Sequence, residues 1–232
     1  MNWDQVVKKV TPHVMKIETP SGHGTGFLFL YNDAKTMCGL ATADHVISHA
    51  DDWQQPIKIH HPHTGNTIFI KQEERVIYRD LKTDSAVIIF IKGNLELPES
   101  PIALLPMGTL IDIGAEVGWL GFPSVAPYNL CFFSGNISAR QEFRNAYLVD
   151  GVAINGVSGG PVMRLSETDG VQIIGTVSAY SANRATGEAL PGLAIAQDVS
   201  HFHDVANHVH SIDEANRKKA EFEAAQEQPP QT

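Results

Sequence analysis

The chain has 232 residues, 43% of them hydrophobic, and a formal net charge of −9. A chain of this length can bury a substantial core without a disulfide scaffold. The acidic balance argues against a nucleic-acid partner, because phosphate neutralisation needs clustered lysines and arginines. No apolar stretch reaches the length that a membrane span requires. These observations predict a globular protein with no nucleic-acid partner and no membrane span.

The N-terminus and the cysteines bear on the cellular compartment. No apolar segment follows Met1, so no signal peptide is visible and we expect a cytoplasmic protein, unless the chain begins after a removed segment. Cys38 and Cys131 are the only cysteines. Such economy fits a reducing compartment or a bacterial origin. A disulfide or a redox switch is one interpretation of the pair, and two buried free thiols are the interpretation we favour.

Strand signals dominate the first half of the chain. Short β-branched or aromatic runs alternate with turn residues, which is typical of strands, and Gly65-Asn66 predicts a hairpin turn. Segment 92–101 is rich in turn formers and is the expected linker between two halves. The predicted strands of the first half are 27–30, 57–60, 67–70, 76–78 and 86–91.

The second half repeats this pattern and then changes character. Many short strands at regular spacing favour closed barrels or sandwiches. Beyond Asp198, apolar residues recur with helical spacing through Ile212, and Ser200 is the expected helix cap. The final residues, from Gln226, are expected to be disordered. The predicted strands of this half are 116–121, 130–133, 146–149, 162–163, 172–178 and 192–196.

Three motifs carry chemistry. Ser158 lies among glycines in the run 156–161, His45 follows the apolar stretch 40–43, and Asp84 precedes a β-branched run. A serine hydroxyl becomes a good nucleophile when a base stands beside it and backbone N–H groups face the oxyanion that forms. Flanking glycines permit the tight turn that exposes the hydroxyl. The chain order histidine, aspartate, serine is the chymotrypsin-type order, not that of subtilisin or the α/β-hydrolases.

These motifs resemble those of the trypsin-like, chymotrypsin-fold serine peptidases. The resemblance runs from about Val6 to about Val199, and segments 10–17 and 22–27 are most similar to the bacterial Deg/HtrA branch, here without a PDZ module. It implies an all-β fold of two six-stranded antiparallel barrels with the active site between them and a C-terminal α-helix. The implied units are a protease domain at 1–200, with barrels of about 1–100 and 101–200, and a helix with a disordered tail at 201–232.

The resemblance also implies an activity and the roles of the site residues. The enzyme would be a serine endopeptidase acting on proteins or peptides, with no cofactor and no metal. Ser158 would be the nucleophile, His45 the general base and Asp84 the residue that orients the imidazole. The backbone N–H groups of Gly156 and Ser158 would form the oxyanion hole.

The specificity pocket is expected between the residues before Ser158 and a later strand. No charged residue stands at its expected floor, so we expect cleavage after small or medium apolar residues and not after lysine or arginine. Val157 replaces the aspartate that pairs with a newly cut N-terminus in digestive members, so activation by N-terminal cleavage is not expected. The expected lining residues are Val152, Ala153, Ile154, Val177, Ser178, Ala179, Tyr180 and Gly192.

Other interpretations stay open at this point. Asp44 and Asp80 compete with Asp84, and His23 and His49 compete with His45. Histidines cluster at 60–63 and 201–210, which suggests a metal site, although a solvated loop and helix are the interpretation we favour. A partner-activated processing protease and a catalytically silent interaction module are the alternative functions. A homo-oligomer or an activating protein partner is also left open.

Overall fold

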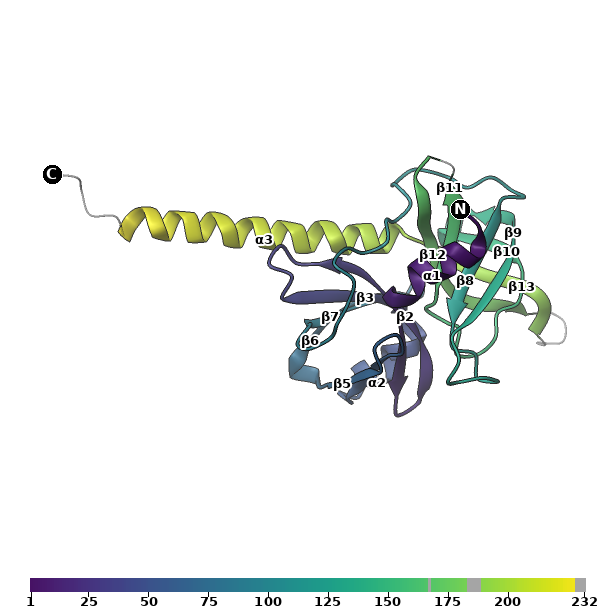
Figure 1. Ribbon diagram of the computed structural model, residues 1–232, viewed down its shortest axis with the longest axis horizontal. Helices are drawn as coiled ribbons and strands as arrows, with labels where there is room; N and C mark the ends of the chain where they lie inside the picture. Colours follow the sequence, from purple (N-terminus) through teal and green to yellow (C-terminus); the bar gives the residue numbers. More distant parts are fainter. Residues whose placement is uncertain (167, 183–188, 228–232) are drawn as a thin grey trace.

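The computed structural model describes residues 1–166, 168–182 and 189–227, and it consists mainly of β-strands in two sheets (Figure 1). The first sheet has seven strands in the order β5-β4-β1-β2-β3-β7-β6, and the second is a closed barrel in the order β10-β13-β12-β11-β8-β9. The strands of the first sheet are β1 (Val14–Thr19), β2 (Gly22–Tyr31), β3 (Met37–Ala43), β4 (Ile57–His61), β5 (Asn66–Ile70), β6 (Arg75–Asp80) and β7 (Ser85–Ile91). Those of the barrel are β8 (Glu116–Gly121), β9 (Cys131–Gln141), β10 (Ala146–Asp150), β11 (Pro161–Ser166), β12 (Gly170–Ala182) and β13 (Ala189–Asp198).

The chymotrypsin-like fold class is confirmed, with one correction in the first half. That half is a curled seven-stranded sheet and not a closed six-stranded barrel, because β5 and β6 are its two edges. Only the short helix η2 (Gln72–Glu74) joins them. The buried Arg75 guanidinium donates to the carbonyl of Ile70 at 3.1 Å and to that of Gln55 at 2.8 Å. Side-chain hydrogen bonds at this gap therefore replace part of the missing strand pairing.

The central strands β2, β3 and β7 of the first sheet are buried on both faces, which explains their almost continuous apolar runs. Successive side chains of a strand point to opposite faces. In β2, Phe27 and Phe29 belong to the core shared with the barrel, whereas Leu28 belongs to the core inside the curled sheet. In β7, Val87 and Ile88 divide between the two cores in the same way. The hairpin predicted at Gly65-Asn66 is confirmed by the antiparallel pairing of β4 with β5.

Three α-helices complete the fold: α1 (Trp3–Val10), α2 (Asp44–Asp52) and α3 (Ser200–Glu227). The short 3-10 helix η1 (Thr11–His13) joins α1 to β1, and η3 (Glu142–Arg144) joins β9 to β10. Phe202 anchors α3, with its ring centroid 6.1 Å from Phe27 and 5.6 Å from Phe29. The remainder of α3 runs outward past the first sheet, so that its C-terminal half projects from the body (Figure 1).

Two expectations about the chain ends need correction. Ser200 is the first residue of α3 and not its cap, because the Asp198 carboxylate accepts the Ser200 N–H at 3.0 Å. Helix α3 continues to Glu227, so Gln226 and Glu227 are helical where disorder was expected; the rest of that segment, 228–232, lies outside the described residues. Cys38 and Cys131 are both free, the first buried and the second partly exposed. Within the described part of the chain, no helix is long and apolar enough to cross a membrane.

Candidate active site

Strand register brings His45 and Asp84 together. The last residue of β3, Ala43, lies opposite the first residue of β7, Ser85, so the segments that extend beyond this pair are neighbours. His45 Nδ1 is 2.8 Å from Asp84 Oδ2, and the His45 backbone N–H donates to Asp84 Oδ1 at 3.0 Å. Asp84 has a φ of +47°, an unfavourable conformation for a residue with a side chain, and such strain concentrates at functional sites. One carboxylate therefore fixes both the ring and the backbone of His45.

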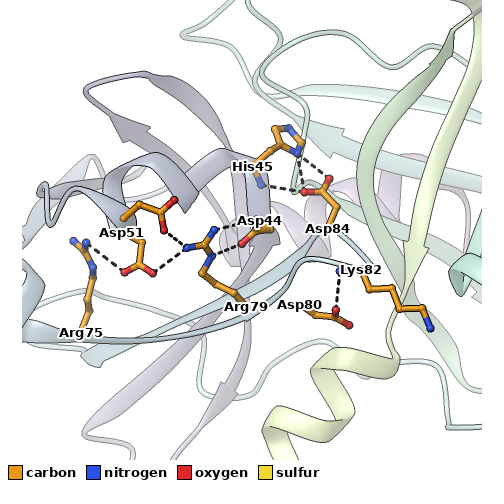
Figure 2. A network of polar contacts seen from close by, with 9 residues as sticks. Asp44, His45, Asp51, Arg75, Arg79, Asp80, Lys82 and Asp84 are labelled. Carbon is orange, nitrogen blue, oxygen red and sulfur yellow. Dashed lines mark hydrogen bonds and ion pairs between the residues drawn. The ribbon is translucent and has the colours of Figure 1, made fainter.

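A network of ion pairs holds the helix that carries His45 (Figure 2). Arg79 on β6 donates to Asp44 Oδ1 at 2.6 Å and to Asp52 Oδ1 at 2.6 Å, so it ties both ends of α2 to the sheet. These carboxylates, with Asp44 nearest, raise the pKa of Arg79 above its ordinary value. Asp44 is therefore excluded as the partner of the His45 ring. Asp80 is excluded as well, because its carboxylate accepts hydrogen bonds from Lys82 and Thr83 within its own turn.

Two glycines with positive φ shape the turn that carries Ser158. Gly156 has a φ of +92° and Gly159 a φ of +82°. A Cβ on Gly159 would overlap the Thr25 carbonyl on β2 and the Thr42 hydroxyl on β3, the strand that leads to His45. The Thr25 N–H donates to the Ser158 carbonyl at 2.8 Å. Only a glycine at 159 therefore lets the turn approach the first sheet closely enough to place Ser158 beside His45.

The backbone around Gly156 leaves two N–H groups available. The Asn155 carbonyl oxygen accepts a hydrogen bond from the Ser124 N–H at 2.7 Å, and the Val157 N–H donates to the Ile154 carbonyl at 3.0 Å. Within the described chain, the N–H groups of Gly156 and Ser158 have no intramolecular acceptor. Two free N–H donors on alternate residues of a tight turn are the arrangement that stabilises an oxyanion.

His45, Asp84 and Ser158 line one cavity of about 270 Å³. The hydroxyl of Ser158 is 3.5 Å from the Ser178 carbonyl, and within the described residues this is its one hydrogen-bond partner. The hydroxyl has therefore not yet formed a hydrogen bond to the imidazole. Catalytic hydrogen bonds are often long in enzymes without substrate and shorten in the substrate complex.

The environment of His45 favours its protonated form. The hydrogen bond to Asp84 is the largest cause, and it raises the pKa of His45 above the ordinary value of 6.5 although partial burial lowers it. The imidazole side chain is half exposed, whereas that of Asp84 is 26% exposed. A base with a raised pKa accepts a proton from a serine more readily.

Ser178 has a contact that sequence reasoning missed. It was expected in the specificity pocket, and it does line the cavity, but its hydroxyl also donates to Asp84 Oδ2 at 2.5 Å. The Asp84 carboxylate thus accepts hydrogen bonds from the His45 ring, the His45 backbone and the Ser178 hydroxyl. No local pattern in the sequence signals this contact, since residues 84 and 178 meet only when the barrel packs on the sheet.

Five of the eight expected pocket residues line the cavity. Ala153, Val177, Ser178 and Ala179 line the cavity together with Ile154 and Asn155, and Asn155 was not predicted although it directly precedes Gly156. Val152 is 49% exposed and does not line the cavity. Gly192 also lies outside the lining, because its carbonyl accepts the Gly151 N–H at the end of the neighbouring strand. The side chain of Tyr180 lies outside the described part of the chain.

Val157 packs into the core beneath the nucleophile turn. Its side chain is fully buried and lies against the Cα of Gly121, where a Cβ would overlap it. Apolar packing therefore holds the turn at the position where digestive relatives use an ion pair. In the described part of the chain, no group of three or more histidine, cysteine, aspartate or glutamate side chains is arranged to hold a metal ion.

Comparison with known proteins identifies the family. The family model of the trypsin-like peptidase domain matches residues 24–175, more than half of the chain. The chain belongs to the trypsin-like peptidase family. This confirms the resemblance seen in the sequence and the expected class of enzyme, a serine endopeptidase. A comparison with curated proteins gave no significant match.

Solved structures support the fold of the peptidase. The Rv3671c protease of M. tuberculosis, in an inactive form, is 18% identical with a TM-score of 0.63, and the match covers 88% of this chain and 92% of that chain. A serine endoprotease from Yersinia pestis is 20% identical with a TM-score of 0.64, and the match covers 91% of this chain and 67% of that chain. At this level of identity, the likeness establishes the shared fold alone.

Proposed function

We propose that the peptidase cleaves peptide bonds with Ser158 as the nucleophile, His45 as the general acid and base, and Asp84 as the residue that orients His45. The observation that carries this proposal is the single cavity shared by the bonded His45–Asp84 pair and the Ser158 hydroxyl. The two free N–H groups beside Ser158 support it, because charge that develops on the carbonyl oxygen needs donors already in place.

The reaction proceeds in two halves. The Ser158 oxygen bonds to the carbonyl carbon while its proton passes to His45 Nε2, and the N–H groups of Gly156 and Ser158 stabilise the oxyanion. The C–N bond then breaks as His45 returns the proton to the leaving amine. Water attacks the acyl-enzyme, giving a proton to His45, and that proton returns to the Ser158 oxygen as the acid product leaves.

We further propose that the residue before the scissile bond is small or medium-sized and apolar. Among the residues that the structure describes, the lining of the cavity carries no charged side chain apart from the proposed catalytic pair, and Ile154, Val177 and Ala179 supply apolar surface. A lysine or arginine side chain would lose its hydration in such a pocket without gaining a partner. A positional-scanning peptide library measures this preference, and a strong preference for arginine or lysine would contradict it.

We propose that residues 1–200 form the catalytic unit, with α3 appended to it. The contribution of α1 to the core supports the N-terminal bound of this unit, since Val6 and Val10 are fully buried with residues of the barrel. At the other bound, Phe202 and Val205 anchor the first turns of α3 to the same core. The segment 92–101, the expected linker between the two halves, contains no strand. Proteolysis of the folded protein should leave a fragment that still includes α1.

Labelling with a fluorophosphonate probe tests the chemistry. We expect the isolated wild-type chain to be labelled and to hydrolyse peptides, the Ser158→Ala variant to be unlabelled, and the exposed-site control Ser134→Ala to be labelled like the wild type. Labelling that appears only after addition of a protein partner would indicate a partner-activated processing protease. No labelling under any condition would leave a catalytically silent interaction module.

A further inference from the structure

A second pocket, separate from the cavity that holds Ser158, lies on the first sheet and the loop after β8. It has a volume of about 340 Å³ and is lined chiefly by Lys16, Glu18, Lys58, His60, Phe122 and Tyr128. We call it the lysine pocket. It lies across β4, β1 and the loop after β8, and it shares no residue with the cavity that holds Ser158.

Strand register connects the lysine pocket to the site. Lys16 lies opposite Thr25 on β2, and Glu18 lies opposite His23. Opposed residues in an antiparallel pair point to the same face of a sheet. The Thr25 hydroxyl donates to the Gly156 carbonyl at 2.9 Å, and His23 Nε2 is 3.3 Å from the Phe122 carbonyl. This face of the sheet therefore carries both the nucleophile turn and the two pocket residues on β1.

The same face continues onto β4, where Lys58 lies opposite Glu18 and His60 opposite Lys16. Adjacent strands are about 4.8 Å apart, so the pocket begins about one strand beyond His23 and Thr25. The side chain of the acyl residue occupies the cavity against β12 in the proposed reaction. The β2 side of Ser158 is then left for the residues that follow the scissile bond.

The charges of the lysine pocket do not balance. Lys16 Nζ is 3.0 Å from Glu18 Oε1, and Lys58 Nζ is 2.6 Å from Glu18 Oε2, so two ammonium groups share one carboxylate. Burial opposes ionisation of Glu18, but the hydrogen bonds from Lys58 and Lys16 outweigh it and hold the pKa of Glu18 below its ordinary value. The loop at 122–130 contributes no charged residue. The two lysines and the one glutamate therefore give the pocket lining a net charge of +1.

The exposure of the lining shows where a ligand can enter. The Lys16 side chain is 8% exposed, and its Nζ lies 5.3 Å from the centre of the Tyr128 ring, whereas the Lys58 side chain is 38% exposed. Tyr128 itself is 90% exposed, with its ring free to cover a bound chain. A pocket with a net positive charge attracts an anion, and a carboxylate that reaches the more exposed Lys58 would form a charge-assisted hydrogen bond with it.

We propose that the lysine pocket binds an acidic side chain of the substrate, at the second or third residue after the scissile bond. This rests on the proposed function, because it assigns a specificity site to the same reaction. Lys58 contacts the acidic side chain, while Lys16 forms the buried wall of the pocket and Tyr128 its exposed rim. An extended chain advances about 3.3 Å per residue, so these two positions match the distance of one to two strands from Ser158.

Matched peptides test the proposal by hydrolysis. They share one apolar residue before the scissile bond and carry aspartate, serine or lysine at the second and third positions after it. We expect kcat/KM for the aspartate peptide to exceed that for the lysine peptide by about threefold to tenfold, with a smaller ratio at high salt. Lys58→Gln should reduce the ratio and Lys58→Glu should invert it, whereas Lys71→Gln, an exposed lysine outside the pocket, should leave it unchanged.

A binding measurement separates failure of this inference from failure of the proposed chemistry. The same peptides are titrated into Ser158→Ala and into the Ser158→Ala, Lys58→Gln double variant by fluorescence anisotropy, after thermal unfolding has shown that both are folded. Tighter binding of the aspartate peptide that is lost in the double variant supports the lysine pocket, even if the wild type hydrolyses nothing. Equal binding of aspartate and lysine peptides overturns it, even if the wild type is an active peptidase.

Discussion

The seven-stranded sheet and the closed barrel contribute different parts of the site. The sheet holds His45 and Asp84, which are bonded to each other within one hydrogen-bond network before any substrate arrives. The barrel supplies Ser158, the glycine turn and the wall formed by β12. The hydroxyl of Ser158 still points to the barrel's own Ser178 carbonyl. Each half is thus organised internally, and the bond that must form between them, from Ser158 to His45, is the one left to the substrate complex.

The largest expected loss of activity comes from a substitution in the sheet's part of the site. Asp84→Asn should lower kcat by about 10⁴-fold, because an amide that donates to the ring would favour the wrong tautomer of His45. Steady-state hydrolysis of an apolar-site peptide measures this loss. The control Asp33→Asn lies in an exposed turn far from the site and should retain full activity. A loss of less than tenfold in Asp84→Asn would mean that another group orients His45.

The next largest loss of activity is expected from a substitution in the barrel's part of the site. Gly156→Ala should lower kcat by about 10²- to 10³-fold, the usual cost of a damaged oxyanion hole. Its φ of +92° disfavours alanine, and a Cβ would overlap the Phe122 carbonyl. Gly170→Ala, at a φ of +72° with open space around the Cβ position, imposes similar backbone strain elsewhere. Comparing the two variants separates loss of catalysis from loss of stability.

The contact between the halves should have an intermediate effect. Ser178→Ala removes the hydrogen bond from the barrel to Asp84, and a hydrogen bond to a charged group contributes about 1.5–3 kcal/mol. Part of that is recovered by water, so we expect kcat to fall about tenfold with little change in KM. Ser178→Thr retains the hydroxyl and should restore most of kcat. Equal losses in the two variants would show that the side chain acts through pocket shape and not through Asp84.

Activity and stability should both depend on pH through the His45–Asp84 pair of the sheet. Because the hydrogen bond to Asp84 raises the pKa of His45 above 6.5, kcat/KM should be at least about fourfold lower at pH 6 than at pH 8. The same raised pKa stabilises the fold below the unfolded-state pKa, and this contribution is lost as pH rises through the folded-state pKa. Activity and this part of stability therefore change in opposite directions. A profile measured with Ser158→Ala by thermal unfolding and with the wild type by hydrolysis checks both signs.

The smallest effect concerns a histidine of the sheet that is remote from catalysis. Burial lowers the pKa of His61, whose ring is fully buried and lies 2.8 Å from the Pro12 carbonyl. Its contribution to stability should be lost as pH falls below about 6.5, because the unfolded chain then binds a proton more readily. The Tm should fall between pH 7 and pH 5.5, and His61→Gln should reduce that fall. An unchanged fall would assign it to other groups.

How much of the site could be predicted depends on how local each signal is. The glycine run around Ser158 and the apolar run after Asp84 are contiguous in sequence, so their residue types indicated their positions directly. Asn155 could have been predicted from its place before Gly156. The contact of Ser178 with Asp84 could not, because it joins residues 94 positions apart across two sheets. Val152 was predicted to line the pocket, but it does not line the cavity. Its distance along the chain from Ser158 does not say which side of the turn it faces.

The sequence by itself determined the strand-rich fold, the order of the three site residues and the class of enzyme, because alternation, turn formers and short motifs are local properties. The tertiary structure decided that the first sheet stays open beside Arg75 and that the Asp198 carboxylate, not the Ser200 side chain, accepts a backbone N–H at the start of α3. It also decided that Lys16 and Lys58 share Glu18. Those outcomes depend on strand register and on which elements become neighbours. Register fixes which side chains meet across a sheet, and it is set by packing of the whole chain.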